Sequence, residues 1–182
     1  NDYLSLGKPV HDYITDWYIL VDDTYALAKT KSSASESSVT EKAAPTTSNV
    51  LVNGISISFE AYTINGNNYF KLRDLAQAVN NTEKNFDVTW DGSKNAINLI
   101  SNKPYTPVGG ELAQGDGKAK VATPTASKIY KDGKEISLTA YTINGNNYFK
   151  LRDIAKAFDI GVTWDSATNT VSIDTSIGYV EE

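Results

Sequence analysis

The feature that most constrains the fold of this chain is an internal repeat. The fourteen residues 61–74, AYTINGNNYFKLRD, recur without a single change at 140–153. Farther along, the first copy carries five additional residues at 81–85 before the two copies realign at VTWD, so that Trp90 corresponds to Trp164. An insertion between two matching blocks is typical of a surface loop. The chain therefore contains one small folding unit twice, which limits the folds open to it.

Each copy has the pattern of two strands, a helix and two further strands. Apolar and polar residues alternate over 57–61, as in a half-buried strand, and residues 65–66, Asn-Gly, suit a two-residue type I′ turn. Apolar spacing over 72–79 predicts a short helix, and alternation over 86–99 predicts the last two strands. The predicted fold class is α+β, with two small repeats, each an antiparallel β-sheet packed on one α-helix in the order β-β-α-β-β.

Other segments surround the repeats. Residues 31–48 and 103–127 are rich in small and polar residues, so they bury too little apolar surface to offset their ordering entropy and are expected to be linkers. Apolar residues at helical spacing over 11–30 predict an N-terminal amphipathic helix. The predicted organisation is a helical segment at 1–30, a linker at 31–48, a first module at 49–102, a linker at 103–127, a second module at 128–176 and a tail at 177–182.

The apolar stripe of the predicted N-terminal helix, which includes Trp17, Tyr18 and Val21, needs a partner. Either it packs on the modules, or it is the last helix of an upstream domain that has been cut away. Because a module of about 50 residues is marginally stable alone, we expect the two modules and the helix to dock on one another. The chain has no methionine, so we also expect it to be a piece of a longer protein.

The composition argues against several classes of function. Without cysteine the chain has no disulfide, no thiolate metal site and no cysteine nucleophile. Its net charge of −5, with acidic and basic residues interspersed, argues against nucleic acid as a partner. No apolar run approaches the roughly 20 residues of a bilayer-spanning helix, so no membrane span is expected.

The repeated segments resemble a known family. The block AYTINGNNYFKLRD followed by VTWD, present in both copies, is similar to the copper amine oxidase N-terminal-like, or stalk, domain, here in two tandem copies. The resemblance implies a small antiparallel sheet packed on one helix, found as an accessory module on exported and wall-associated proteins of Gram-positive bacteria. It implies no activity, because this module is not the part of those oxidases that binds copper or carries the quinone cofactor.

Few residues offer chemistry for a metal or a reaction. Copper sites are built from imidazole and sulfur ligands, and His11 is the only histidine in a chain without cysteine or methionine. Asp87, Asp91 and Asn95 lack the ligand spacing of a calcium-binding loop and are interpreted as turn residues. The lone histidine has no visible partner for nucleophilic catalysis. We expect no catalytic residue, no cofactor and no metal site.

Tyrosines are the best candidates for ligand contact. Tyr62, Tyr69, Tyr141 and Tyr148 alternate out of phase with the apolar face. Tyrosines on a surface often mark a contact site, although cross-strand packing partners show the same pattern. We therefore predict that these four residues lie on the surface and contact a ligand.

The tryptophans and arginines of the repeats favour structural roles. Trp90 and Trp164 could be platforms on which sugars stack, but each is in phase with the core residues that precede it, so burial is predicted. Arg73 and Arg152 lie at the step from strand to helix. We expect each arginine to pair with a carboxylate or to cap a carbonyl.

Together these features predict a non-catalytic accessory module of a secreted or cell-surface protein. Its expected partner is cell-wall glycan or another surface protein. Two alternatives stay open, namely an architectural spacer without a ligand and the C-terminal region of a secreted enzyme whose catalytic domain is absent. Binding to purified walls separates the first two, and the upstream reading frame decides the third.

Overall fold

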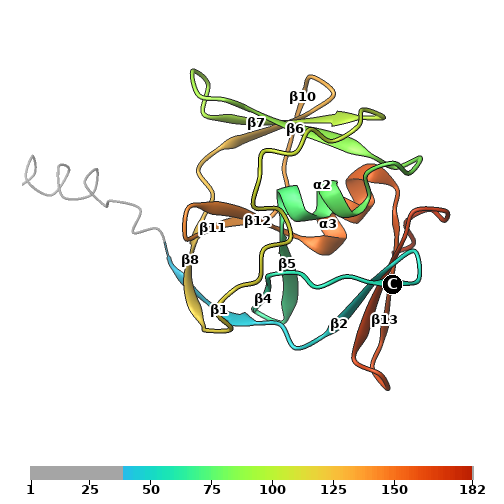
Figure 1. Ribbon diagram of the computed structural model, residues 1–182. Helices are drawn as coiled ribbons and strands as arrows, with labels where there is room; N and C mark the ends of the chain where they lie inside the picture. The colour runs from blue at the N-terminus through green and yellow to red at the C-terminus, as the bar shows by residue number, and fades with distance from the viewer. Residues whose placement is uncertain (1–38, 182) are drawn as a thin grey trace, which may run out of the picture. The chain divides into compact units, whose positions relative to one another are not determined.

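The computed structural model describes residues 39–181 (Figure 1), and the predicted helix at 11–30 lies outside this range. The first repeat contributes β1 (Glu41–Pro45), β2 (Asn49–Val52), β3 (Ile55–Ser56), β4 (Ala61–Ile64), β5 (Asn67–Lys71), α2 (Leu72–Ala78), β6 (Phe86–Asp91) and β7 (Ala96–Ser101). The second contributes β8 (Lys120–Pro124), β9 (Lys128–Lys131), β10 (Lys134–Ile136), β11 (Ala140–Ile143), β12 (Asn146–Lys150), α3 (Leu151–Phe158), β13 (Gly161–Asp165) and β14 (Thr170–Asp174). The two repeats thus contain the same elements in the same order. No helix in the described part of the chain is long and apolar enough to cross a membrane.

The identical block forms the same local structure in both repeats. At the hairpin turn, Asn65 and Gly66 have φ values of 49° and 77°, and Asn144 and Gly145 have φ values of 49° and 78°. A type I′ turn requires positive φ at both central residues, which asparagine and glycine adopt at low cost. The turn therefore forms where the sequence predicts it.

Six strands close into a barrel in the order β1-β4-β5-β12-β11-β8, three from each repeat (Figure 1). The repeats join at the antiparallel pairs β5–β12 and β1–β8, and Phe70 of β5 lies opposite Phe149 of β12. Closure gives each of these strands a partner on both sides, so the barrel has no exposed edge. Its interior is filled by Ala43, Tyr62, Ile64, Tyr69, Ala122, Ile143 and Tyr148.

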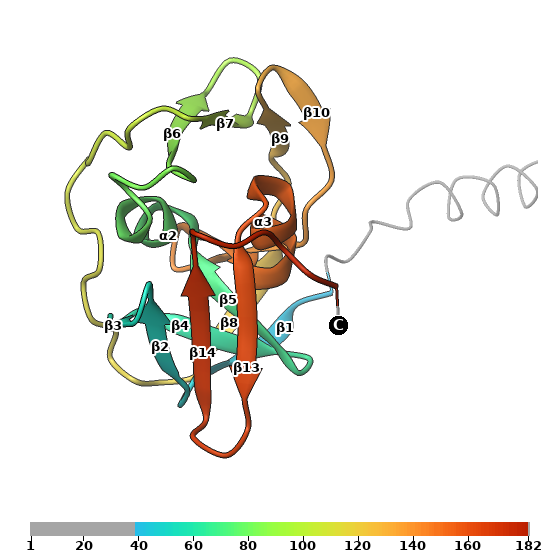
Figure 2. The same ribbon diagram turned by 90° about the vertical axis from the view of Figure 1, so that its right-hand side faces the viewer.

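Two four-stranded sheets lie outside the barrel, and each combines strands from both repeats (Figure 2). In one sheet, the β6–β7 hairpin joins the β9–β10 hairpin through parallel pairing of β7 with β9. In the other, the β13–β14 hairpin joins β2–β3 through parallel pairing of β14 with β2, which places Val171 opposite Val50. The last hairpin of each repeat therefore completes a sheet with strands of the other repeat.

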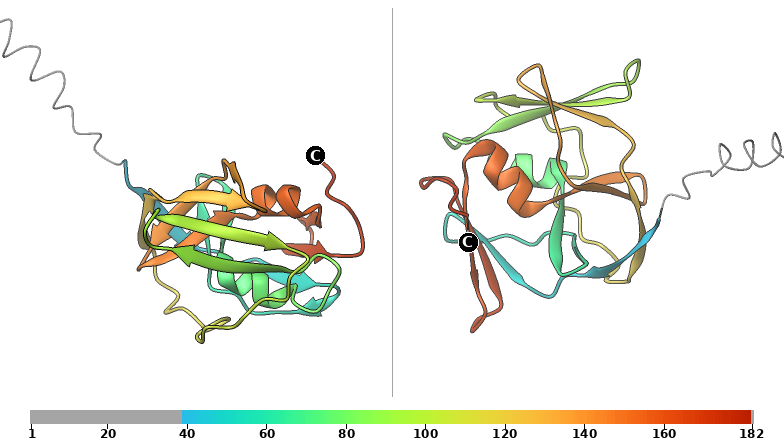
Figure 3. Two further views of the ribbon diagram at one scale, coloured as in Figure 1. Left: turned by 90° about the horizontal axis from the view of Figure 1, so that it is seen from above. Right: turned by 180° about the vertical axis from the view of Figure 1, so that it is seen from behind.

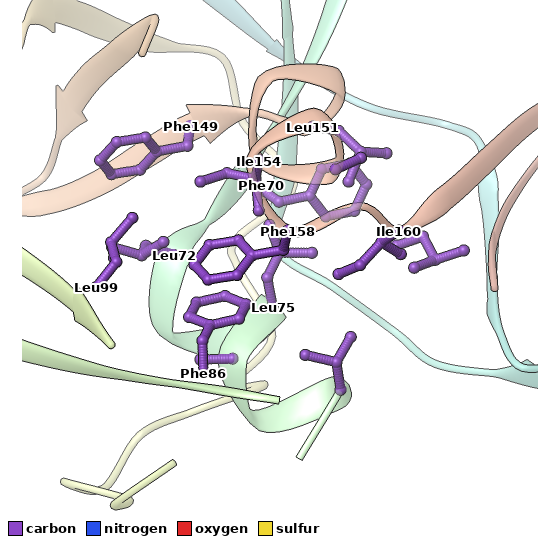
Figure 4. Close-up of a cluster of buried hydrophobic side chains, with 14 of the residues drawn as sticks. Phe70, Leu72, Leu75, Phe86, Leu99, Phe149, Leu151, Ile154, Phe158 and Ile160 are labelled. Atoms are coloured by element: carbon purple, nitrogen blue, oxygen red, sulfur yellow. The ribbon is translucent and has the colours of Figure 1, made fainter. Parts of the chain in front are cut away.

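Helices α2 and α3 lie at the centre of the fold, between the barrel and the two sheets (Figure 3). Each helix packs on a strand of the other repeat, α2 on β12 and α3 on β5. Figure 4 shows the core around them, in which Phe86 of the first repeat stacks on Phe158 of the second with ring centroids 4.1 Å apart. Phe70 and Phe149 belong to the same cluster and are fully buried. One hydrophobic core thus serves both repeats.

The predicted α+β fold class is wrong. The described chain is mostly β, with a closed barrel and two mixed sheets, and it is not a pair of repeats that each pack one sheet on one helix. The physical reason is strand pairing, because a separate sheet in each repeat would expose unpaired edges that the other repeat can fill. Both predicted linkers also contain strands, since residues 41–45 form β1 and residues 120–124 form β8. The expected docking of the two repeats takes the form of shared strands.

Candidate functional site

Two tryptophans are prominent on the surface of the described chain. Trp90 in β6 and Trp164 in β13 are 52% and 43% exposed, so their predicted burial is wrong. Each lies opposite a buried aliphatic residue of the neighbouring strand, Ile97 for Trp90 and Val171 for Trp164. Cross-strand partners point to the same face of a sheet, so the phase inferred from the sequence is right. The rings are exposed because these strands run past the edge of the core, and burial along β6 ends at Val88.

Trp164 lies on the wall of a groove of about 430 Å³, called here the Trp164 groove. The second repeat lines it with the end of β13 and with residues 150–152, where β12 runs directly into α3. The first repeat lines it with residues 66–68, which are the last residue of its hairpin turn and the first two residues of β5. These segments meet because β5 of the first repeat pairs with β12 of the second. The site therefore exists only when both repeats are folded together.

Trp90 lines a second groove, of about 180 Å³, called here the Trp90 groove. Residues 71–73 and 145–147 line it, and they are the repeat counterparts of 150–152 and 66–68. The two grooves are thus built from equivalent parts of the repeats, with the contributions of the first and second repeat exchanged. The described structure carries the same arrangement of side chains twice.

Asparagines that follow the hairpin turns, in β5 and β12, supply oriented polar groups to both grooves. In the Trp164 groove, the Oδ1 atom of Asn68 accepts hydrogen bonds from the hydroxyls of Thr46 and Thr63, at 3.2 and 3.1 Å. In the Trp90 groove, the Oδ1 atom of Asn147 accepts one from the hydroxyl of Thr142 at 3.2 Å. The NH₂ group of each side chain then remains as a donor, because an amide carries its donors and its acceptor on opposite atoms. Sequence reasoning missed both asparagines, although the duplicated Asn-Gly-Asn-Asn run was a visible signal.

The two grooves differ in the partner of their lysine. In the Trp90 groove, the Nζ atom of Lys71 lies 3.1 Å from Glu60 and 3.8 Å from the buried Asp74. Burial opposes ionisation of Glu60, but hydrogen bonds from a tyrosine hydroxyl and from Lys71 hold its pKa below the ordinary value. Thr139 occupies the equivalent of position 60 in the second repeat. Lys150 of the Trp164 groove accordingly has no ion-pair partner among residues 39–181.

Arg73 is held in place beside the Trp90 groove. Its Nη1 atom donates to the carbonyl oxygen of Val88 at 3.4 Å and to the hydroxyl of Tyr105 at 3.3 Å. The contact with Val88 is the carbonyl cap expected for this arginine. Tyr105 is buried and donates in turn to Glu111 at 2.7 Å, and its burial raises its pKa to about 12. This part of the predicted linker is therefore packed against the first repeat.

The four candidate tyrosines do not lie where the sequence predicts. Tyr62, Tyr69 and Tyr148 are buried in the barrel, and Tyr141 is half-buried beside them, so their expected surface position is wrong. They form two edge-to-face pairs, Tyr62 with Tyr148 at 5.3 Å and Tyr69 with Tyr141 at 5.2 Å. Burial raises the pKa of Tyr69 to about 12. Barrel closure is the physical cause, because it encloses the second face of each hairpin.

The acidic candidates for a cation site are dispersed. Asp87 is buried, and although burial opposes its ionisation, hydrogen bonds from Lys103 and from two backbone N–H groups hold its pKa below the ordinary value. Asp91 accepts hydrogen bonds from the hydroxyl and the N–H of Ser93 within a turn. Asn95 donates to the carbonyl of Ala126. The interpretation as turn residues holds for Asp91 and Asn95, which flank the turn between β6 and β7, but it is wrong for Asp87, which is a buried residue of β6.

The residues described here do not fit a copper site. Among residues 39–181, no group of three or more His, Cys, Asp or Glu side chains could hold a metal ion. The lone histidine, His11, lies outside the described residues. Copper is bound mainly by imidazole and sulfur ligands, and this part of the chain offers neither. No step of a proposed function is therefore assigned to copper.

Comparison with known proteins identifies the family. The family model of the copper amine oxidase N-terminal domain matches residues 51–173. This is one continuous stretch from β2 to β14 that spans both repeats. No curated protein and no solved structure matches the chain. The family is a non-catalytic accessory domain. Since the match covers more than half of the sequence, this protein belongs to the copper amine oxidase N-terminal domain family.

Proposed function

We propose that this chain is a non-catalytic accessory module of an exported Gram-positive protein and that it binds cell-wall glycan through the two tryptophan grooves. The single observation that carries the proposal is the duplicated pair of exposed indoles, each beside an oriented asparagine amide. The resemblance to wall-associated stalk domains supports the cellular setting. The ligand contact predicted for the four tyrosines is assigned instead to Trp90 and Trp164, because the tyrosines pack in the barrel.

The grooves match the chemistry of a sugar ring. A pyranose presents an apolar C–H face that can pack on an indole, and it presents hydroxyls that need hydrogen-bond partners. Small-ligand sites typically combine an aromatic or apolar wall with a few polar groups placed around it. Trp164, Asn68 and the hydroxyl of Thr163 supply this combination in the larger groove. A repeating polymer could occupy both grooves and gain affinity by avidity.

The composition of the grooves favours binding over hydrolysis. Glycosidases need a pair of carboxyl groups on either side of the scissile bond. Within residues 39–181, no aspartate or glutamate lines either the Trp164 groove or the Trp90 groove. Glu60, the nearest carboxylate to Lys71, is held by hydrogen bonds from Tyr62 and Lys71. The geometry thus supports an accessory role in which the sugar is held and left intact.

The proposal is tested by sedimentation of the full chain with purified Gram-positive cell walls. We expect Trp90→Ala and Trp164→Ala each to weaken binding about five-fold, a loss of about 1 kcal/mol. The double variant should weaken binding by about 30-fold, because losses at separate sites add. Both tryptophans are about half exposed and lie outside the buried core, so truncation should leave the fold intact. Circular dichroism of each variant checks this expectation.

Val121→Ala is the matched control, because Val121 is 67% exposed and lines neither groove. It should bind walls as tightly as the unchanged chain. Wall binding that persists in the double tryptophan variant would contradict the proposed site. No binding by the unchanged chain would favour the alternative of a spacer without a ligand.

A further inference from the structure

We propose that the Trp164 groove takes a glycan that carries carboxylates, whereas the Trp90 groove takes a neutral glycan. This inference rests on the proposed function, because it names the ligand class for the same two grooves. It arises from one difference between sites that the repeat otherwise builds from equivalent residues. That difference is the partner of the groove lysine.

The positive charge of Lys71 in the Trp90 groove is balanced by carboxylates of the protein itself. The side chain of Lys71 is 12% exposed, and its ammonium lies between Glu60 at 3.1 Å and Asp74 at 3.8 Å. Both carboxylates are on the first repeat and are partly or fully buried. An incoming anion would meet an ammonium that already has two acidic neighbours, so the charge of Lys71 adds little to its binding.

The lysine of the Trp164 groove lacks this compensation. Thr139 replaces Glu60, and its carbonyl oxygen accepts the N–H of Lys150 at 3.0 Å, so the two residues are direct neighbours. Asp153, the counterpart of Asp74, accepts the N–H of Thr139 at 2.9 Å and forms no ion pair with Lys150 among residues 39–181. Among the residues that the structure describes, Lys150 therefore has no carboxylate partner, and no aspartate or glutamate lines the groove.

An unpaired lysine beside an aromatic wall selects an acidic sugar. The ammonium attracts a carboxylate and forms charge-assisted hydrogen bonds with it, which are stronger than neutral ones. The indole and the amide of Asn68 can still hold the sugar ring, as their counterparts do in the Trp90 groove. Specificity also needs an element that disfavours the wrong ligand. Glu60 is that element beside the Trp90 groove: it does not line the groove, but its charge is held 3.1 Å from the groove lysine, Lys71, and disfavours an acidic glycan there.

The test uses the full chain and two soluble oligosaccharides of equal length, an oligogalacturonate with carboxylates and a neutral chitooligosaccharide. Trp90→Ala isolates the Trp164 groove, and Trp164→Ala isolates the Trp90 groove. Isothermal titration calorimetry measures each affinity at low and high sodium chloride. We expect the oligogalacturonate to bind the Trp164 groove preferentially and to weaken as salt screens the charge.

Exchange of the decisive residue sharpens the test. In the Trp90→Ala background, Thr139→Glu should lower the affinity for oligogalacturonate by roughly 10-fold, because it supplies Lys150 with the carboxylate that Lys71 already has. Thr139→Gln introduces a side chain of the same size as glutamate but without its charge, and it should leave this affinity unchanged. Lys150→Gln should reproduce the loss without adding an acidic group. Neither substitution of Thr139, which does not line the groove, should change the affinity for the chitooligosaccharide.

The outcomes separate this inference from the proposed function. If the Trp164 groove binds both oligosaccharides equally, or if Thr139→Glu behaves like Thr139→Gln, the charge assignment is wrong while tryptophan-dependent wall binding still stands. If the Trp164 groove binds inorganic phosphate but does not bind oligogalacturonate, the groove recognises phosphate. This result would also overturn the carboxylate assignment. Loss of tryptophan-dependent wall binding would instead overturn the proposed function.

Discussion

Truncation of one core phenylalanine tests whether the two repeats unfold as a unit. Phe149 of β12 is fully buried and lies opposite Phe70 of β5, at the junction where the repeats join the barrel. Both rings belong to the core that also contains Phe86 and Phe158 (Figure 4). Phe149→Ala therefore removes packing from both repeats, although the changed residue belongs to the second repeat alone.

The expected magnitude follows from the burial of the ring. Truncation of a fully buried phenylalanine to alanine costs about 3–5 kcal/mol, out of a total stability of about 5–15 kcal/mol for a typical domain. With a urea dependence of about 2 kcal/mol per molar, the unfolding midpoint should fall by about 2 M. Phe149→Leu, which keeps most of the volume, should cost less than about 1.5 kcal/mol.

The assay follows urea unfolding by the fluorescence of one tryptophan in each repeat. Two variants keep only Trp90 or only Trp164, with the other tryptophans replaced by phenylalanine. Because the hairpins are exchanged, Phe149→Ala should lower the midpoint by the same amount in both variants. If only the Trp164 signal shifts, the repeats are independent units and the argument from shared strands is refuted.

Three further outcomes are expected. Gly161→Ala should cost about 1–3 kcal/mol in chemical denaturation, because its Cβ would lie 2.3 Å from a side-chain carbon of Ile177; an unchanged midpoint would show that this segment moves freely. Burial opposes ionisation of Glu111, but hydrogen bonds from a tyrosine hydroxyl and backbone N–H groups hold its pKa at about 2, below the ordinary 4.5. Because the pKa of Glu111 is lower in the folded state, its ionised carboxylate stabilises the fold above about pH 4.5, and this stabilisation is lost as the pH falls toward 2. Glu111→Gln should therefore flatten the plot of unfolding free energy against pH in this range. An unaltered plot would exclude this role. The isolated fragments 49–103 and 127–182 should melt at a clearly lower temperature than the full chain by circular dichroism, because each fragment lacks the strands with which it pairs in the other repeat. Equal melting midpoints would contradict this pairing between the repeats.

The local structure of this protein could be predicted from its sequence because its signals are local. The Asn65-Gly66 turn, the helix that begins at Leu72 and the hairpin that contains Trp90 need only neighbouring residues to form. The internal repeat and the family could also be recognised from the sequence, because both depend only on the order of the amino acids. These features account for what each repeat contains.

Only the tertiary structure decided which surfaces those elements bury. Alternation of residues along a strand shows that the strand has two different faces, but it does not show which part of the protein covers each face. The barrel enclosed the face that carries Tyr62 and Tyr148, while the exchanged hairpins carried Trp90 and Trp164 past the edge of the core. Both results depend on pairing between strands far apart in the chain, such as β2 with β14. Pairing at such a distance leaves no local signal in the sequence, and so the grooves appeared only when the two repeats were seen folded together.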